Sequence, residues 1–363
     1  MESPIIMVVL ANHHRQLVSE YFPTFVPRVL GILTLEAKPQ ADEHARASEA
    51  GTFFTGVSPV IRNSQYSSQY TDLITVQIKF ISFIVFVIRS FAPILNTQIS
   101  IVPSMIIRLL KDCPPHAYMA RKELLVALRH IVNTEHRRHF VTYVNLFLEE
   151  RILIGSGLTA KLTLRPLAYN TVAELVHHVR SDLSPMQIWR TVDVFLSNLN
   201  DPNFGAHFQS MCVRLLLNIL DRLSNFPRPE QCRYILLLVL LSVTERLKEY
   251  NEQMSEQCQI FNKARNIIHT SIDSTTSVKD CKVMTRNLLV FSRSLAFSLK
   301  ASNPPALHRV LEAQWQDSAK VFGLSAVEIF RELFKQTLAA LKLKPVIEDS
   351  TASKEYMDAI VAF

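Results

Sequence analysis

Apolar residues recur at helical spacing along most of this chain. Within residues 162–182 they follow one another at steps of three and four positions, at Ala168, Val172, Leu175, Val176 and Val179. The spacing returns after the turn at Asp201-Pro202, at Phe208, Met211, Cys212, Leu215, Leu216, Ile219 and Leu223. Such steps place side chains on one face of an α-helix, so both stretches predict helices with a buried face.

Polar residues mark where some of these helices begin. Ser184 is followed by Pro185 and then by Gln187, which is the pattern of a capping box with proline in the first turn. Ser325 and Glu328 make a second capping box near the end of the chain. Each box predicts a helix that starts directly after its serine.

The clearest helix starts, near Ala117, Leu162 and Ala206, are 45 and 44 residues apart. HEAT repeats recur about every 40 to 47 residues, and each repeat needs its neighbours to bury its apolar face. We therefore expect an all-α fold, a solenoid of HEAT-like helical repeats. The organisation that follows is residues 1–35 as a helical pair of HEAT type, 36–72 as a mobile polar loop or insertion, 73–270 as HEAT-like repeats, 271–280 as a surface loop and 281–363 as further HEAT-like helices.

Two further expectations concern the prolines near the start of the chain and two apolar runs. Pro23 and Pro27 predict a break between the first two helices, because proline does not fit a helix interior. The apolar runs Phe80–Ile88 and Tyr234–Val243 are bounded by charged residues and are about ten residues long, whereas a membrane span needs about 20. We interpret both runs as buried helices of the solenoid and expect no membrane insertion.

Composition supports the all-α class. The chain has 7 glycines in 363 residues, and 48% of its residues are hydrophobic. Sheets and hairpins need glycine in their turns, so this scarcity favours helices joined by polar or proline-containing turns. The 20% of charged residues is too low for general disorder.

The sequence contains no enzyme motif that we could identify. Gly155-Ser156-Gly157 precedes Lys161, but the spacing is not that of a phosphate-binding loop, and a turn is the simpler interpretation. The pairs His13-His14 and His177-His178 are adjacent rather than four apart, so we interpret them as structural. We predict no catalytic residue, no metal site, no cofactor and no small-molecule substrate, although scattered residues can still meet in space.

Charge gives the one candidate binding surface. The net charge is +7, and between Arg108 and Asp182 eleven Lys and Arg stand against seven Asp and Glu. These cations could attract acidic partners or phosphates, or they could simply form a solvated helix face. The surplus is small for a nucleic-acid binder, so we keep nucleic-acid binding through residues 108–182 as the alternative. The candidate partner-binding residues are Arg121, Lys122, Arg129, Arg137, Arg138, Arg165 and Arg180.

Five widely separated cysteines and the lack of a secretion signal are typical of the nucleus or cytosol.

Within Cys113–Leu223, the segments LLKDCPPHAYMARKELLVALRHIV, ERILIGSGLTAKLTLRPLAYNTVAELVHHVRSDLS and LNDPNFGAHFQSMCVRLLLNILDRL closely resemble the TRRAP family. The members of that family are giant pseudokinase scaffold subunits of histone acetyltransferase complexes such as SAGA. The opening PIIMVVLANHHRQLVSEYFPTFVP is similar to the family's N-terminal HEAT region more loosely.

The resemblance implies a non-catalytic scaffold segment in the nucleus. Its partners would be transcription activators and other subunits of acetyltransferase complexes, docked on the helical repeats. It also implies that the chain is a fragment of a far longer protein, from the N-terminal HEAT region of that protein. Both ends of such a fragment would expose apolar faces that neighbouring repeats cover.

Overall fold

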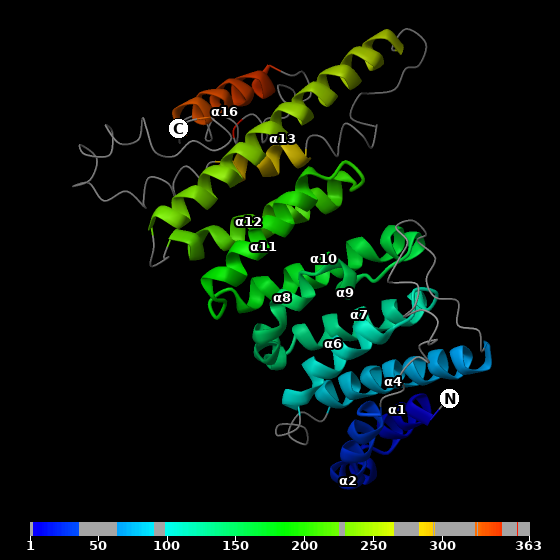
Figure 1. Ribbon diagram of the computed structural model, residues 1–363. Helices are drawn as coiled ribbons and strands as arrows, with labels where there is room; N and C mark the ends of the chain where they lie inside the picture. The colour runs from blue at the N-terminus through cyan, green and yellow to red at the C-terminus, as the bar shows by residue number, and fades with distance from the viewer. Residues whose placement is uncertain are drawn as a thin grey trace, which may run out of the picture. The chain divides into compact units, whose positions relative to one another are not determined.

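The computed structural model describes residues 3–35, 64–90, 99–224, 229–264, 283–292 and 326–342, together with the single positions 294, 324 and 354. Its regular elements are α-helices and short 3-10 helices (Figure 1). The prediction of an all-α fold is therefore confirmed for the described residues. The chain divides into two compact units, Met1–Val179 and Arg180–Phe363.

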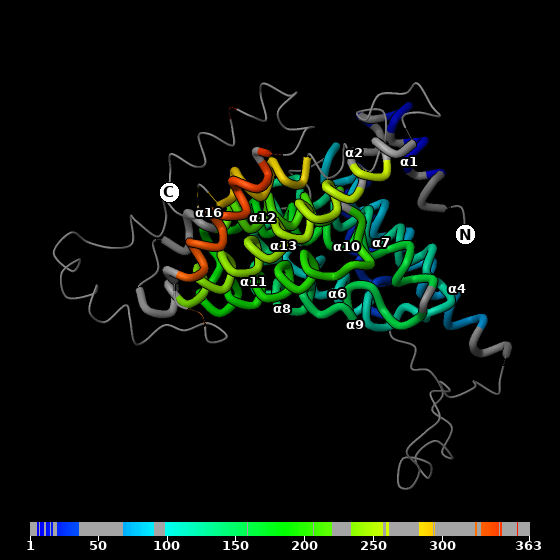
Figure 2. The backbone as a smooth tube through the Cα atoms, turned by 90° about the horizontal axis from the view of Figure 1, so that it is seen from above, coloured from blue at the N-terminus to red at the C-terminus, as the bar shows by residue number. Residues whose placement is uncertain are grey.

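The first unit is built around three long helices that lie side by side, α4, α7 and α10 (Figures 1 and 2). The shorter α6 packs against α4, α7 and α9, and α1 and α2 pack on each other and on α4. The bounds are α1 Ser3–His13, α2 Arg15–Leu33, α4 Ser64–Ser90, η1 Ile99–Ile101, α6 Val102–Asp112, α7 Tyr118–Val132, η2 Glu135–Tyr143, α8 Val144–Phe147, α9 Glu150–Leu153 and α10 Leu158–Val179.

The second unit contains α11 Pro185–Asn200, α12 Ala206–Ser224, α13 Pro229–Ala264 and α16 Ala326–Leu341, with helical residues also at 283–292. Helix α13 packs against α11, α12 and α16. Its buried Asn251 donates to the carbonyl oxygen of Gln336 in α16 at 2.9 Å. This bond joins residues far apart in the sequence within one packed unit.

Hydrogen bonds between neighbouring helices show the repeat period directly. In the first unit, Tyr70 donates to the carbonyl oxygen of Asp112, 42 residues later. In the second unit, Asn200 donates to Ser242, also 42 residues later, and Tyr250 donates to Gln209, 41 residues earlier. The helix starts predicted from the sequence recur at a similar interval. The hydrogen bonds between neighbouring helices therefore follow the HEAT-like repeat.

The predicted helix starts and buried faces agree with the structure where it describes them. Ser184 and Gln187 form both bonds of the capping box at the start of α11. The five apolar residues predicted for α10 are all buried, and in α12 Phe208, Cys212, Leu215, Leu216 and Ile219 are buried as well. Met211 is half-buried, while Ser325 and the side chain of Leu223 lie outside the described residues.

The predicted break at the two prolines is wrong. Pro23 and Pro27 both lie inside α2, and the break comes earlier, at His14, whose backbone leaves the helical region. Both prolines are on the exposed side of α2. Water can therefore bond the carbonyl oxygens of Ser19 and Pro23, which lose their helical amide donors, and this lowers the cost of proline within a helix.

The polar stretch predicted as a loop over residues 36–72 ends earlier than expected, because α4 begins at Ser64. Residues 36–63 and the loop predicted at 271–280 lie outside the described residues. Of the further helices predicted at 281–363, the structure describes residues 283–292 and α16.

Helix α4 is more apolar than the run Phe80–Ile88 indicated. By length and composition, Ser68–Ser90 is the one candidate membrane span among the described residues. Within that segment, 56% of an 18-residue apolar stretch is buried inside the protein, and α4 packs against α7 above all. Its fully buried Gln77 donates to the carbonyl oxygens of Ile32 and Leu35 at 2.9 and 2.8 Å. These contacts are those of a packed core helix.

Side chains from the next helices cap the end of α2. Besides Gln77, Arg108 of α6 donates to the carbonyl oxygens of Leu33 and Leu35. The last carbonyls of a helix lack amide partners, and many helices satisfy them with a glycine in a left-handed turn. Here amide and guanidinium donors of neighbouring repeats take that role, which is consistent with the low glycine content.

Candidate partner-binding surface

The structure does not gather the predicted cations into one basic patch. Arg121, Lys122 and Arg129 lie on α7, at different angles around the helix, and Arg165 lies on α10. Arg137 and Arg138 belong to η2, while Arg180 is the first residue of the second unit. The environments of these side chains decide which of them a partner could reach.

Arg121 was predicted to contact partners, and the structure corrects this prediction. Its side chain is buried, with 3% of the residue exposed. The guanidinium donates to the carbonyl oxygens of Leu110 and Cys113, at the end of α6, at 2.7 and 3.0 Å. It also donates to Ile152 at the end of α9, at 2.8 Å. Arg121 therefore caps two helix C-termini at once, where the carbonyl dipoles favour a cation.

The charge of Arg121 is stabilised by these carbonyl oxygens rather than by a carboxylate of the described residues. Burial lowers the pKa of its guanidinium, and it raises the pKa of the neighbouring Cys113 thiol, an effect that the charge of Arg121 partly offsets. The charge-assisted hydrogen bonds of Arg121 join α7 to the ends of α6 and α9. Arg121 is a structural residue of the first unit.

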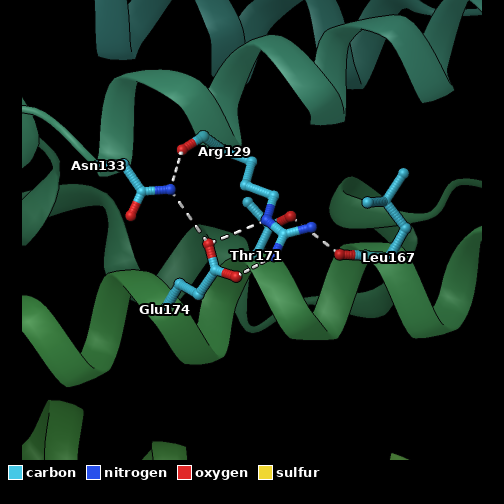
Figure 3. Close-up of polar contacts among 5 residues, drawn as sticks. All are labelled: Arg129, Asn133, Leu167, Thr171 and Glu174. Carbon is cyan, nitrogen blue, oxygen red and sulfur yellow. Dashed lines mark hydrogen bonds and ion pairs between the residues drawn. The ribbon is translucent and has the colours of Figure 1, made fainter.

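Arg129 joins α7 to α10 (Figure 3). Its guanidinium bonds both carboxylate oxygens of Glu174, with Nε at 3.0 Å from Oε2. Asn133, one turn further along α7, donates to the same carboxylate at 3.4 Å and to the carbonyl oxygen of Arg129 at 3.1 Å. The hydrogen bond to Glu174 raises the pKa of Arg129. This charge is balanced within the unit.

Arg165 takes part in a second internal cluster. Its guanidinium lies 3.2 Å from the carboxylate of Glu150 in α9, and Lys161 lies 3.5 Å from the same carboxylate. The hydroxyl of Tyr169 donates to Glu150 at 3.2 Å. One carboxylate thus receives three donors from α10, and little of the Arg165 charge is available to a partner.

The remaining cations of the first unit differ in exposure. Arg137 is half-buried and donates to the carbonyl oxygen of Thr134 at 3.1 Å. Lys122 and Arg138 are exposed, and within the described part of the chain neither side chain makes a hydrogen bond or ion pair. Of the predicted residues in this unit, these two combine an exposed side chain with no internal bond to another described residue.

The histidines of η2 lie close together without forming a larger ligand cluster. The rings of His136 and His139 are stacked with their centroids 6.3 Å apart. Burial lowers the pKa of His136, the nearby His139 lowers it further, and Glu135 acts in the opposite direction. Among the described residues, no group of three or more His, Cys, Asp or Glu side chains could hold a metal ion.

The stretch Gly155-Ser156-Gly157 connects α9 to α10, as expected for a turn. Gly155 has a φ of 83°, and a Cβ built there would stand 2.9 Å from the Cζ of Arg121. The positive φ favours glycine, and the missing side chain gives the guanidinium room to reach the end of α9. Gly155 thus provides space for the Arg121 side chain, and a phosphate is not needed to explain this glycine.

The sequence contains signals for these contacts. Arg121 is in phase with the buried Leu124 and Leu128, so the helix period already places it on the inner face. Glu174 follows Arg129 by 45 residues, which is one repeat. A search for opposite charges separated by one repeat would have identified this pair.

Comparison with known proteins agrees with the fold. Residues 69–267 match the family described as the Tra1 HEAT repeat central region, whereas the resemblance had implied the N-terminal HEAT region. The chain is 30% identical over 358 residues to the SAGA complex/NuA4 acetyltransferase complex subunit Tra1 of Schizosaccharomyces pombe, covering 93% of this chain and 10% of that protein. It is 38% identical over 259 residues to the corresponding subunit of Saccharomyces cerevisiae, covering 69% of this chain and 7% of that protein.

A human relative, the transformation/transcription domain-associated protein, is 34% identical over 220 residues, which are 61% of this chain and 5% of that protein. The chain therefore spans a tenth or less of the length of these relatives. Together with the helical structure, the match confirms the predicted fold class, an all-α solenoid of HEAT-like repeats.

Proposed function

The chain belongs to the Tra1/TRRAP family, and from this membership we propose that it is a non-catalytic scaffold segment of a transcription coactivator subunit. It would act in the nucleus, where it would dock activators and partner subunits of a histone acetyltransferase complex. The single observation that carries the proposal is the match of residues 69–267 to the HEAT region of that family. The names of the relatives supply the complexes, SAGA and NuA4.

The environments of the charged residues support a scaffold. Arg121, Arg129 and Arg165 hold neighbouring helices together instead of converging on a site. A catalytic site needs titratable groups that converge on one place, whereas each of these three arginines joins different helices. A stack of helices offers a large surface for other proteins, which is the usual role of such repeats.

Nucleic-acid binding through residues 108–182 gains little support from these environments. Phosphate binding requires accessible cations. Of the predicted cations in this window, Arg121 is buried, and Arg129 and Arg165 are paired with carboxylates. We therefore retain protein docking as the proposed function.

The experiment that tests the proposal is a cross-linking map of the native assembly. The protein containing this chain would be affinity-purified under native conditions and treated with a lysine-reactive cross-linker. We expect cross-links from exposed lysines such as Lys111 and Lys122 to other subunits, and acetyltransferase activity on histones in the same fractions. Purification without acetyltransferase activity and without cross-links to other subunits would contradict the proposal.

A further inference from the structure

Two aromatic side chains of different helices meet at the surface of the second unit. Trp189 lies on α11 and is half-buried, while Tyr234 lies on α13 and is 47% exposed. Their ring centroids are 6.3 Å apart, and the ring planes are inclined by 40° to each other. Within the described residues, neither the indole N–H nor the tyrosine hydroxyl makes a hydrogen bond. Tryptophan and tyrosine often dominate the binding energy of protein interfaces, so these two residues, the aromatic pair, are a candidate contact for a partner.

Two neighbours on α11 extend the aromatic pair. Met186 comes three positions before Trp189 and is 67% exposed, and Asp193 comes four positions after Trp189 and is also exposed. Residues three or four apart are neighbours on a helix surface, so both side chains adjoin the tryptophan. Asp193 makes no hydrogen bond or ion pair within the described residues, whereas the half-buried Arg190 already has an interaction partner. The aromatic pair therefore lies between an apolar side chain and a carboxylate that no described cation neutralises.

The face of α13 that begins with Tyr234 continues as a row of carboxylates. Glu245, Glu252 and Glu256 come 11, 18 and 22 positions after Tyr234, which are close to whole numbers of helical turns. All three glutamates are exposed, and none makes an ion pair within the described residues. We call these three glutamates the acidic face.

The cations near the acidic face are too few to balance it. Glu249, on the same side of α13, pairs with Arg246, whose side chain is 10% exposed. Lys248 is the other cation between positions 245 and 256, and it is exposed. Four glutamates therefore stand against two cations over these positions. The surface combines exposed aromatic and apolar side chains with an excess of negative charge, which is complementary to a basic partner.

We propose that the aromatic pair binds an arginine side chain of a basic segment of a partner protein, and that this segment continues along the acidic face. The inference rests on the proposed scaffold function and names the kind of partner that this surface docks. Aromatic rings attract cations, and tryptophan attracts them most strongly. A guanidinium is planar, so it stacks on the ring of Trp189 while its N–H groups bond the carboxylate of Asp193, one turn away.

Other side chains match this surface less well. A lysine ammonium is a compact and strongly hydrated charge, without a flat surface to stack on a ring. An apolar side chain would leave Asp193 without a partner, and an acidic one would be repelled by it. The methylene groups of an arginine, in contrast, pack against apolar surface such as that of Met186. Arginine alone uses the rings, the thioether and the carboxylate together.

The test measures binding of labelled peptides to the whole chain by fluorescence anisotropy. From Tyr234 to Glu256 the helix rises about 33 Å, so the probe is a peptide of about twelve residues, which spans roughly 40 Å when extended. It has arginine at every third position, with glycine and serine between. Two matched peptides replace each arginine by lysine or by citrulline, which keeps the planar shape without the charge.

Variants of the chain separate the aromatic contact from the charges. Trp189→Leu and Tyr234→Leu remove the rings and keep apolar side chains, Asp193→Asn removes the nearest charge, and the acidic-face variant replaces all three of its glutamates by glutamine. The matched controls are Tyr21→Leu and Glu20→Gln, at exposed positions of α2 in the first unit. Circular dichroism verifies that each variant is folded, and the exposed Tyr234 remains a test if the half-buried Trp189 does not tolerate leucine.

We expect the arginine peptide to bind the unmodified chain about threefold more tightly than the lysine peptide, and the citrulline peptide to bind weakest. Each ring variant should weaken the arginine peptide about three- to fivefold and abolish its advantage over lysine. The acidic-face variant should weaken both basic peptides about tenfold at low salt, an effect that largely vanishes near 1 M salt, where the Debye length is about 3 Å. The controls should stay within about twofold of the unmodified chain.

Tryptophan emission shows whether the peptide occupies the aromatic pair itself. The chain has two tryptophans, Trp189 and Trp315, so Trp315→Phe leaves Trp189 as the one source of this emission. The arginine peptide should change the emission of this variant over the same concentration range as it changes the anisotropy, and the citrulline peptide should change it far less.

Three results would overturn the inference: no binding of the arginine peptide at low salt, equal effects of the ring and control variants, or equal binding of the arginine and citrulline peptides. The proposed function can fail independently. If cross-links to complex subunits are found but the arginine peptide does not bind, only the docking surface is wrong. If the peptide binds as expected but no subunits are cross-linked, the scaffold proposal is wrong.

Discussion

The guanidinium of Arg121 occupies the space beside Gly155 where any other residue would place its Cβ. The distance from that Cβ position to Cζ of Arg121 is 2.9 Å, and the backbone of Gly155 has a φ of 83°. One glycine therefore provides both the turn after α9 and the access of a buried cation to the end of that helix. The conformation of Gly155 and the position of Arg121 therefore depend on each other. Substitutions at both positions test this dependence.

Replacing Arg121 by alanine should strongly destabilise the first unit. The carbonyl oxygens of Leu110, Cys113 and Ile152 would lose their buried donors, and a cavity would remain. We expect a loss of about 2–5 kcal/mol in the free energy of unfolding, from the cavity and the unsatisfied carbonyls, and Arg121→Lys to recover only part of it because lysine lacks the planar fork of donors. Urea unfolding measures both variants, and Lys122→Ala, on the exposed side of α7, should change stability by less than about 0.5 kcal/mol.

Replacing Gly155 by alanine should destabilise the unit for two separable reasons. A left-handed backbone costs an L-residue about 1–2 kcal/mol, and the new Cβ would collide with Arg121. In an Arg121→Ala background the second cost disappears, so the same substitution should cost only about 1–2 kcal/mol there. Equal costs in both backgrounds would contradict the proposed contact.

Gly31, which lies within helix α2, provides a control at which alanine should raise the stability of the protein and not lower it. No atom lies within 4 Å of a Cβ built on Gly31 in α2. Gly31→Ala should therefore stabilise the protein by about 0.5–1 kcal/mol.

The sequence was sufficient for elements whose signal lies within one helix. The capping box at Ser184 and the buried face of α10 depend on neighbouring residues, and both were correctly predicted. The break at Pro23 and Pro27 was wrong because the energy of proline in a helix depends on whether water reaches the freed carbonyls, which is a tertiary property.

The candidate site was less predictable for a related reason. A count of charges treats Arg121 and Lys122 alike, yet one is buried and the other exposed because they point in different directions from α7. Arg129 and Arg165 are balanced by carboxylates on other helices, Glu174 and Glu150. Only the repeat register, combined with the helix period, separates structural cations from accessible ones.

The ion pair between Arg129 and Glu174 should contribute modestly to stability. Both side chains are partly exposed, at 46% and 29%, so solvent screens the attraction. In a double-mutant cycle with Arg129→Met and Glu174→Gln, we expect a coupling of about 0.5–1 kcal/mol, near the upper end for exposed pairs because the geometry is bidentate. The coupling should decrease in 1 M salt.

The pair Lys335–Glu332 provides the matched control for that cycle. It lies within one helix, at 3.5 Å and with exposures of 73% and 40%. Its coupling should be about 0.3 kcal/mol or less. If the two cycles gave the same value, the bidentate geometry across α7 and α10 would not be the source of the stronger coupling.

Stability should also depend on pH through His136. Burial lowers the pKa of this side chain below the ordinary 6.5, and His139 adds to the effect. Between the two pKa values the unfolded chain binds the proton more readily than the folded chain does. The stability contributed by neutral His136 is therefore fully present above about pH 6.5 and decreases as the pH falls toward the folded pKa. Urea midpoints from pH 8 to 5 should decrease less for His136→Gln than for the unmodified chain, whereas the exposed His130→Gln should follow the unmodified chain. Parallel curves for all three proteins would exclude His136 as the source.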